Sequence, residues 1–172
     1  MKQLILISTL FAALFFTACA NSASSVKSDT NRMRFQSVPA PQATLLQTTK
    51  EKDSCIICGM HLPTFYKTSH AADTKHGTRQ YCSIHCVVED NELNKTDLKN
   101  LRVVDVTSLK FISAMDAFYV VGSKKPATMS RTSKYAFAKK SDAQSFAKEF
   151  GGKVMKFYDA YDVATKDFTG KR

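Results

Sequence analysis

The sequence lacks tryptophan, and it lacks any apolar run long enough to cross a bilayer as a helix. The apolar run from Leu4 to Phe16 is broken by Ser8 and Thr9, whereas a membrane-spanning helix needs about 20 residues. Neither paired carboxylates nor a Ser/His/Asp arrangement indicates hydrolysis, so we do not expect an enzyme. Twelve phenylalanines and six tyrosines supply the material for an aromatic core instead.

The apolar run is followed by Phe16-Thr17-Ala18-Cys19, in which two small residues precede a cysteine. This pattern resembles the lipobox of a bacterial lipoprotein, so we expect residues 1–18 to be a signal peptide and Cys19 to be lipidated. Several acyl chains on Cys19 would anchor the chain stably to a membrane. Ala20, in place of aspartate, favours the outer membrane by resemblance to Gram-negative lipoproteins, with the protein facing the periplasm. An ordinary cleaved signal peptide is the alternative.

Residues 19–50 are rich in Ser, Thr, Asn, Gln, Pro and Ala, with little periodicity. Such a composition buries too little apolar surface to order itself, so we predict a lipid-anchored flexible tether over 19–50. Residues 51–172 have the size of one compact domain.

Acidic residues are scarce relative to basic ones: 25 Lys and Arg stand against 15 Asp and Glu, for a net charge of +10. Removing the signal, whose only charged side chain is Lys2, leaves +9. A basic protein attracts nucleic acid, an acidic membrane or an acidic partner. An exported protein seldom meets nucleic acid, so we expect one of the other two.

The pattern of apolar residues predicts two helices, over Ser83 to Leu93 and Ser141 to Phe150. Ser83 suits an N-cap, Ser141 begins a capping box, and Gly151 suits a helix end. Strands are indicated in a hairpin over about Thr64 to Tyr81, and at Leu101 to Val106, Ala117 to Val121, Tyr135 to Ala138 and Val154 to Tyr158. The order strand, strand, helix, strand occurs twice. We therefore predict an α+β fold of two small packed ββαβ units, over about 51–110 and 111–172.

Four cysteines remain after Cys19, in two groups. Cys55 and Cys58 precede Gly59, Met60 and His61, and the second group is Cys82-Ser83-Ile84-His85-Cys86. If a helix begins at Ser83, then Cys82, His85 and Cys86 lie on one helix face, because they are spaced by three and four residues. The two groups can therefore converge on one metal ion.

Four interpretations compete for these residues. The first is a structural zinc site, because the spacing is close to that of a zinc ribbon. Two disulfides would be expected in an oxidising compartment, and a thioredoxin-like redox motif is the third interpretation. The fourth is a soft Cu(I) site of thiolate, thioether and imidazole. A c-type haem is excluded, because Cys58 is followed by Gly59 and not by histidine.

Met60 favours the Cu(I) interpretation over the zinc interpretation. Methionine sulfur is soft and suits Cu(I), whereas methionine is a poor zinc ligand. Gly59 lets the backbone bend, so that Cys58 and Met60 can both face one ion. Core packing is the alternative role for Met60.

Cys58-Gly59-Met60 resembles the signature of the NosL family, the accessory lipoproteins of nitrous oxide reductase. Further segments resemble that family in the same order along the chain: Met115 to Ser123, Pro126-Ala127-Thr128-Met129, Ala136-Phe137, and Ala143 to Val154. The resemblance covers about Cys55 to Tyr158, and the lipoprotein start agrees with it.

The resemblance implies a periplasmic Cu(I) chaperone with a fold of two ββαβ units. It would deliver copper for the copper–sulfur centre of nitrous oxide reductase, working with a membrane ABC transporter complex and with the apo-reductase as a candidate recipient. The family's ligands would be Cys58, Met60 and Met129. Cys55, Cys82, His85 and Cys86 exceed that set and are candidates for a second or extended site, for Cu(I) or Zn(II). A thiol–disulfide oxidoreductase and a zinc-ribbon-like scaffold are the alternative functions.

The segment around Met129 has no acidic residue from Ala117 to Lys140. Pro126 helps to keep Met129 in a loop outside the strands, and the family resemblance implies that Met129 is a ligand there. A basic hairpin tip whose methionine binds no metal is the alternative. Lys124, Lys125 and Arg131 would form a positive collar that docks on an acidic recipient.

Overall fold

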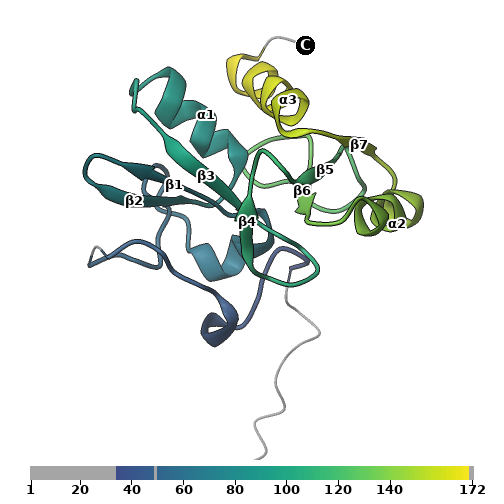
Figure 1. Ribbon diagram of the computed structural model, residues 1–172, viewed down its shortest axis with the longest axis horizontal. Coiled ribbons are helices and arrows are strands. Elements are labelled where there is room, and N and C mark those ends of the chain that lie inside the picture. The colour runs from purple at the N-terminus through teal and green to yellow at the C-terminus, as the bar shows by residue number, and fades with distance from the viewer. Residues whose placement is uncertain (1–33, 49, 171–172) are drawn as a thin grey trace, which may run out of the picture. The chain divides into compact units, whose positions relative to one another are not determined.

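A computed structural model describes residues 34–48 and 50–170 of the 172-residue chain. The predicted signal peptide and Cys19 lie outside these residues. In chain order (Figure 1), the strands and α-helices are β1 (His70–Thr74), β2 (Gly77–Tyr81), α1 (Ile84–Glu92), β3 (Lys99–Val104), β4 (Phe111–Ser113), β5 (Phe118–Val121), β6 (Lys134–Phe137), α2 (Lys140–Phe150), β7 (Lys153–Met155) and α3 (Phe157–Thr169). Short 3-10 helices cover Ala40–Gln42 and Leu62–Thr68. None of the helices in the described ranges combines the length and apolar character needed to cross a bilayer.

The order strand, strand, helix, strand occurs twice, first as β1, β2, α1 and β3 and then as β5, β6, α2 and β7. In each unit the first strand lies at the centre, with antiparallel neighbours on both sides. The sheet orders are β2-β1-β3-β4 and β6-β5-β7, so β4 extends the first sheet by one strand. The predicted α+β fold of two ββαβ units is confirmed.

The two units share a hydrophobic core. Buried side chains from both contribute to it, among them Val88 of α1, Val103 of β3 and Tyr119 of β5. Helix α3 lies alongside α1 (Figure 1), and the Tyr161 hydroxyl donates a hydrogen bond to the Asn91 side-chain oxygen at 3.1 Å. The shared core therefore fixes α1, and with it the residues that α1 carries, against the second unit.

The helix predictions were correct in position but not in every cap. Ser83 is the N-cap of α1, although its side chain makes no capping hydrogen bond. Helix α2 begins after Lys139, so the predicted capping box is wrong, and the Ser141 hydroxyl lies 3.2 Å from the Asp142 carboxylate instead. The turn after α2 needs Gly152, which has a φ of +95° and whose added Cβ would lie 2.8 Å from the Val121 carbonyl oxygen.

The predicted strand from Val154 to Tyr158 is too long, because β7 ends at Met155 and α3 begins at Phe157. The buried residues of α3 are Phe157, Ala160 and Ala164, which are spaced by three and four residues. That spacing is helical, and it places one face of α3 on the shared core. The strand-like alternation at Val154 and Met155 was extended into Phe157 and Tyr158, where the apolar residues already follow the helical spacing.

The folded part begins earlier than predicted, because residues 34–48 of the assigned tether pack on the domain. Phe35 packs edge-on against Tyr135, with ring centroids 5.2 Å apart, and Val38 is buried. The Gln47 amide donates to the Ser54 carbonyl oxygen at 2.6 Å. This segment is held by few apolar residues and by hydrogen bonds from its glutamine side chains to the backbone. Its polar composition therefore did not predict that it is ordered.

His70 is buried in β1, the first strand of the hairpin that was predicted over about Thr64 to Tyr81. Its Nδ1 lies 3.0 Å from the Thr68 carbonyl oxygen, and its Nε2 lies 3.3 Å from the Tyr119 hydroxyl on β5. Burial lowers the pKa of His70 to about 4. The imidazole is therefore neutral at pH 7 and joins the two units.

We expect the protein to lose stability as the pH falls from about 6.5 towards 4. The unfolded chain binds a proton at His70 more readily than the folded chain does, because the folded pKa is depressed to about 4. The stabilisation is complete above the unfolded pKa, and about 2 kcal/mol of it is lost by pH 5. Urea denaturation measures the free energy of unfolding at about pH 7.5 and pH 5. Between these pH values it should fall by about 2 kcal/mol less in His70→Gln than in the parent. An equal loss of stability in both proteins would show that His70 does not cause the pH dependence.

Candidate metal centre

The first pair of cysteines lies in a tight loop before the 3-10 helix at Leu62. The Gly59 N–H donates to the Cys55 carbonyl oxygen at 2.9 Å, and the Cys55 N–H donates to the Met60 carbonyl oxygen at 2.8 Å. Gly59 has a φ of +72°, which favours glycine. The loop therefore turns back on itself and brings Cys55 and Cys58 to the same side.

The second pair comes from the junction of β2 and α1. Cys82 follows the last residue of β2, and Cys86 lies in the first turns of α1, four residues later. The Thr68 hydroxyl lies 2.8 Å from the Cys82 carbonyl oxygen and 2.9 Å from the Thr128 hydroxyl. The backbone at Cys82 is thus tied to the loop that carries Met129.

The four cysteines converge, with their sulfurs all within 4.8 Å of one another. The Sγ–Sγ distances are 3.5 Å for Cys58–Cys82, 3.7 Å for Cys82–Cys86 and 3.7 Å for Cys86–Cys58. All four are free cysteines. A tetrahedral centre with metal–sulfur bonds of about 2.3 Å places its sulfurs about 3.8 Å apart. The four-cysteine centre, Cys55, Cys58, Cys82 and Cys86, therefore fits one soft metal ion.

The four thiols differ in exposure and in acidity. Cys55, Cys82 and Cys86 are buried, and Cys58 is half-buried. The thiols of Cys82 and Cys86 stabilise a thiolate on Cys55 and hold its pKa well below the usual value. The same interactions raise the pKa of Cys82 and of Cys86, and burial raises the pKa of Cys58. The centre thus accepts one negative charge readily, and a bound cation would favour the loss of further protons.

A buried carboxylate supports the second pair of cysteines. Asp90 follows Cys86 by one helical turn, and its carboxylate accepts hydrogen bonds of 2.8 Å each from the Arg79 guanidinium and the hydroxyls of Tyr81 and Thr96. Burial alone would raise the pKa of Asp90, but these bonds hold it below its usual value. Asp90 therefore locks α1 to the end of β2. Sequence patterns did not single out Asp90, although Cys82, Cys86 and Asp90 follow one another at intervals of four residues.

Of the other predicted ligands, Met60 packs against the core cluster that contains Cys55, Cys82 and Cys86. His85 does not join the four cysteines: its ring lies edge-on to Phe168, with centroids 5.1 Å apart, and its buried Nδ1 has no hydrogen-bond partner in the described residues. Burial lowers the pKa of His85.

Met129 is an exposed residue with a φ of +57°. It lines a hollow with Ser130, Arg131, Lys166, Asp167 and Gly170. Lys125 has different surroundings, because its ammonium lies over the rings of Phe35 and Phe150. Of the predicted collar of Lys124, Lys125 and Arg131, only Arg131 lines the hollow beside Met129.

Comparison with known proteins agrees with this architecture. The family model described as NosL matches residues 46–164. The crystal structure of the copper chaperone NosL from Shewanella denitrificans has a TM-score of 0.53 and 24% sequence identity, covering 70% of this chain and 96% of that chain. None of the curated proteins compared with this chain matches it. Because the family model covers well over half of the sequence, this chain belongs to the NosL family.

Proposed function

We propose that this protein carries Cu(I) in its four-cysteine centre and delivers it for assembly of the copper–sulfur centre of nitrous oxide reductase. It acts as a carrier and not as an enzyme. One observation carries the proposal: three sulfurs are buried and the fourth, Cys58, is half-buried beside them. Soft thiolates suit Cu(I), and one accessible sulfur gives an incoming ligand a place to begin exchange.

Family membership and the fold shared with a copper chaperone from Shewanella denitrificans support a role in copper delivery. The lipobox-like start supports a periplasmic location, with the domain held near a membrane by lipid on Cys19. A membrane ABC transporter complex and the apo-reductase are the recipients that we propose.

Met129 is the proposed release ligand. Met129 is exposed. The neighbouring Thr128 bonds to Thr68, which bonds to the Cys82 carbonyl oxygen, so movement of the Met129 loop would shift the backbone at Cys82. Arg131, which lines the same hollow, is the proposed contact for an acidic recipient.

A structural zinc centre is the second candidate, favoured by the near-tetrahedral spacing of three sulfurs. Structural zinc sites are closed. The partial exposure of Cys58 and the packing of Met60 beside the cysteines favour copper over this candidate.

The delivery function can be tested in bacteria that make nitrous oxide reductase and this chain. Reductase purified from cells without the chain should lack copper at its copper–sulfur centre, because no carrier supplies it. The parent chain and the control variant His76→Ala should restore the copper, whereas Cys58→Ser should not. Fully loaded reductase in the Cys58→Ser cells, with the variant present at its normal level, would rule the delivery role out.

A further inference from the structure

Three cations lie over aromatic rings close to where the described chain begins, and two of them share the ring of Phe35. The ammonium groups of Lys67 and Lys125 each lie 4.6 Å from the centroid of the Phe35 ring. Lys125 also lies 3.8 Å from the centroid of Phe150, and the Arg34 guanidinium lies 5.9 Å from the centroid of Phe65. We call Arg34, Lys67 and Lys125 the cationic cradle. These residues come from three segments far apart in the sequence, which the fold brings together.

Among the residues that the structure describes, none supplies a counter-ion to the cationic cradle. Within residues 34–48 and 50–170, no carboxylate oxygen lies within 4.0 Å of its three charged groups. Burial and the neighbouring charge of Lys125 lower the pKa of Lys67. Aromatic faces offset part of the repulsion between two ammonium groups, but an anion would offset it more directly. The arrangement is therefore suited to a negatively charged ligand.

The position of the cradle narrows the choice of ligand. Arg34 and Phe35 are where the chain enters the folded part, and Cys19, the predicted site of lipidation, lies 15 residues earlier. The chain between Cys19 and Arg34 can span at most roughly 50 Å, whatever its conformation. The anchoring membrane is thus within easy reach of this face of the domain.

The chemistry of the cradle also matches a lipid surface. Half-buried lysines that extend over aromatic rings are typical of protein surfaces at the level of lipid headgroups. We propose that the cationic cradle binds the phosphate groups of anionic phospholipids in the membrane that anchors the chain. The lipid on Cys19 holds the domain near the membrane, and the cradle orients it there.

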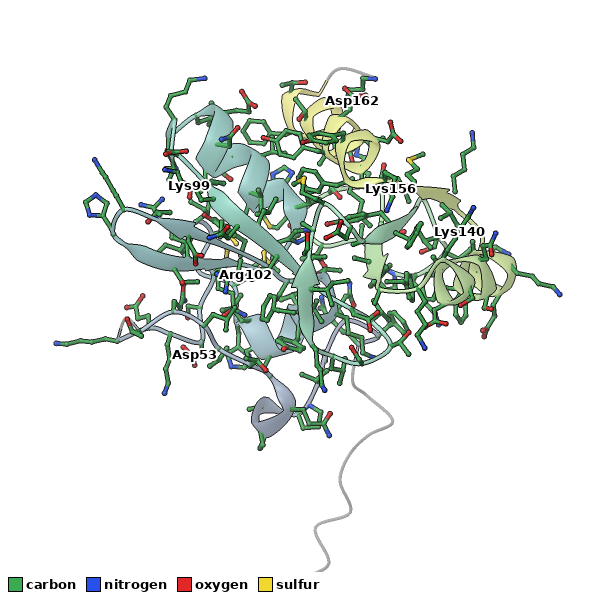
Figure 2. The ribbon with its side chains drawn as sticks, in the orientation of Figure 1. Asp53, Lys99, Arg102, Lys140, Lys156 and Asp162 are labelled. Carbon is green, nitrogen blue, oxygen red and sulfur yellow. The ribbon has the colours of Figure 1, made fainter. Side chains whose placement is uncertain are left out.

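The proposal can be tested with the full lipidated chain in nanodiscs of phosphatidylcholine, alone or with about one-third phosphatidylglycerol. Limiting acetic anhydride acetylates exposed lysines, and mass spectrometry gives the rate at each one. With phosphatidylglycerol present, acetylation of Lys67, Lys125 and the exposed neighbour Lys124 should slow by about tenfold. Lys99 and Lys140, which are exposed and lie on β3 and at the start of α2 (Figure 2), should be unaffected. About 0.5 M salt should remove the protection, because it screens these charges.

Two double variants with the same loss of charge distinguish binding by the cationic cradle from attraction by the net charge of the protein. Lys67→Gln combined with Lys125→Gln should abolish the protection of Lys124, whereas Lys99→Gln combined with Lys140→Gln, with the same loss of charge, should retain it. Equal rates in both kinds of nanodisc would overturn the proposal. Protection of Lys67 and Lys125 by inorganic phosphate in phosphatidylcholine discs would indicate a small-anion site instead. Protection by a polyglutamate peptide but not by phosphatidylglycerol would indicate an acidic protein partner, and would also overturn it.

Discussion

Replacing Cys86 with serine is expected to weaken Cu(I) binding by more than about 100-fold, since even the loss of a residue that only supports a metal ligand typically costs 10–100-fold. Cys86 is fully buried, and its sulfur lies 3.7 Å from those of both Cys58 and Cys82. Serine keeps the shape of the side chain but replaces a soft sulfur with a hard oxygen. Competition against a Cu(I) chelator under anaerobic conditions measures the loss.

The same substitution should lower the melting temperature of the metal-loaded protein and change that of the metal-free protein much less. A metal that binds only the folded chain adds its binding free energy to stability. Met60→Leu is the control, because leucine keeps the packing beside the cysteines but removes the thioether, and we expect a smaller loss of affinity from it. If Cys86→Ser held Cu(I) as tightly as the parent, Cys86 would not be a ligand.

Replacing Asp90 with alanine is expected to destabilise the protein by about 3–5 kcal/mol, the range for removing one partner of a buried ion pair. The Asp90 side chain is fully buried, and the guanidinium of Arg79 would lose its counter-charge. The hydroxyls of Tyr81 and Thr96 would lose an acceptor as well. Urea denaturation of the metal-free protein gives the difference directly.

Asp73→Ala is the matched control for Asp90, because Asp73 also pairs with an arginine, Arg102. The Asp73 side chain is 38% exposed, and an exposed ion pair contributes about 1 kcal/mol or less. A loss in Asp90→Ala no larger than that in Asp73→Ala would show that the buried network does not hold α1 against β2.

The sequence was sufficient where one local signal decided the outcome. The spacing of Ile84, Val87 and Val88 located α1, and the repeated order of elements predicted both ββαβ units. The two groups of cysteines were expected to converge, and they do, although Cys82 lies between β2 and α1 and only Cys86 lies in the helix. Residue type and spacing carry such information without any knowledge of distant contacts.

The sequence was insufficient where distant contacts decided the outcome. His70 is buried because Tyr119, 49 residues later, packs against it. Phe35 is ordered by Tyr135 and Phe146, which lie about 100 residues further along the chain. His85 shares a helix face with the cysteines by spacing, but its ring turns to Phe168 at the end of α3, a helix that was not predicted. Each of these depends on elements that meet only in the folded chain.

Metal analysis tests the central claim, that the four-cysteine centre is a Cu(I) site. The protein would be purified without oxygen, with Cu(I) and Zn(II) both present in excess, and its bound metals counted per chain. We predict one copper and little zinc, with no copper retained when Cys58, Cys82 and Cys86 are all replaced by serine. One tightly held zinc that excess Cu(I) does not displace would contradict the claim and assign the centre to a structural role.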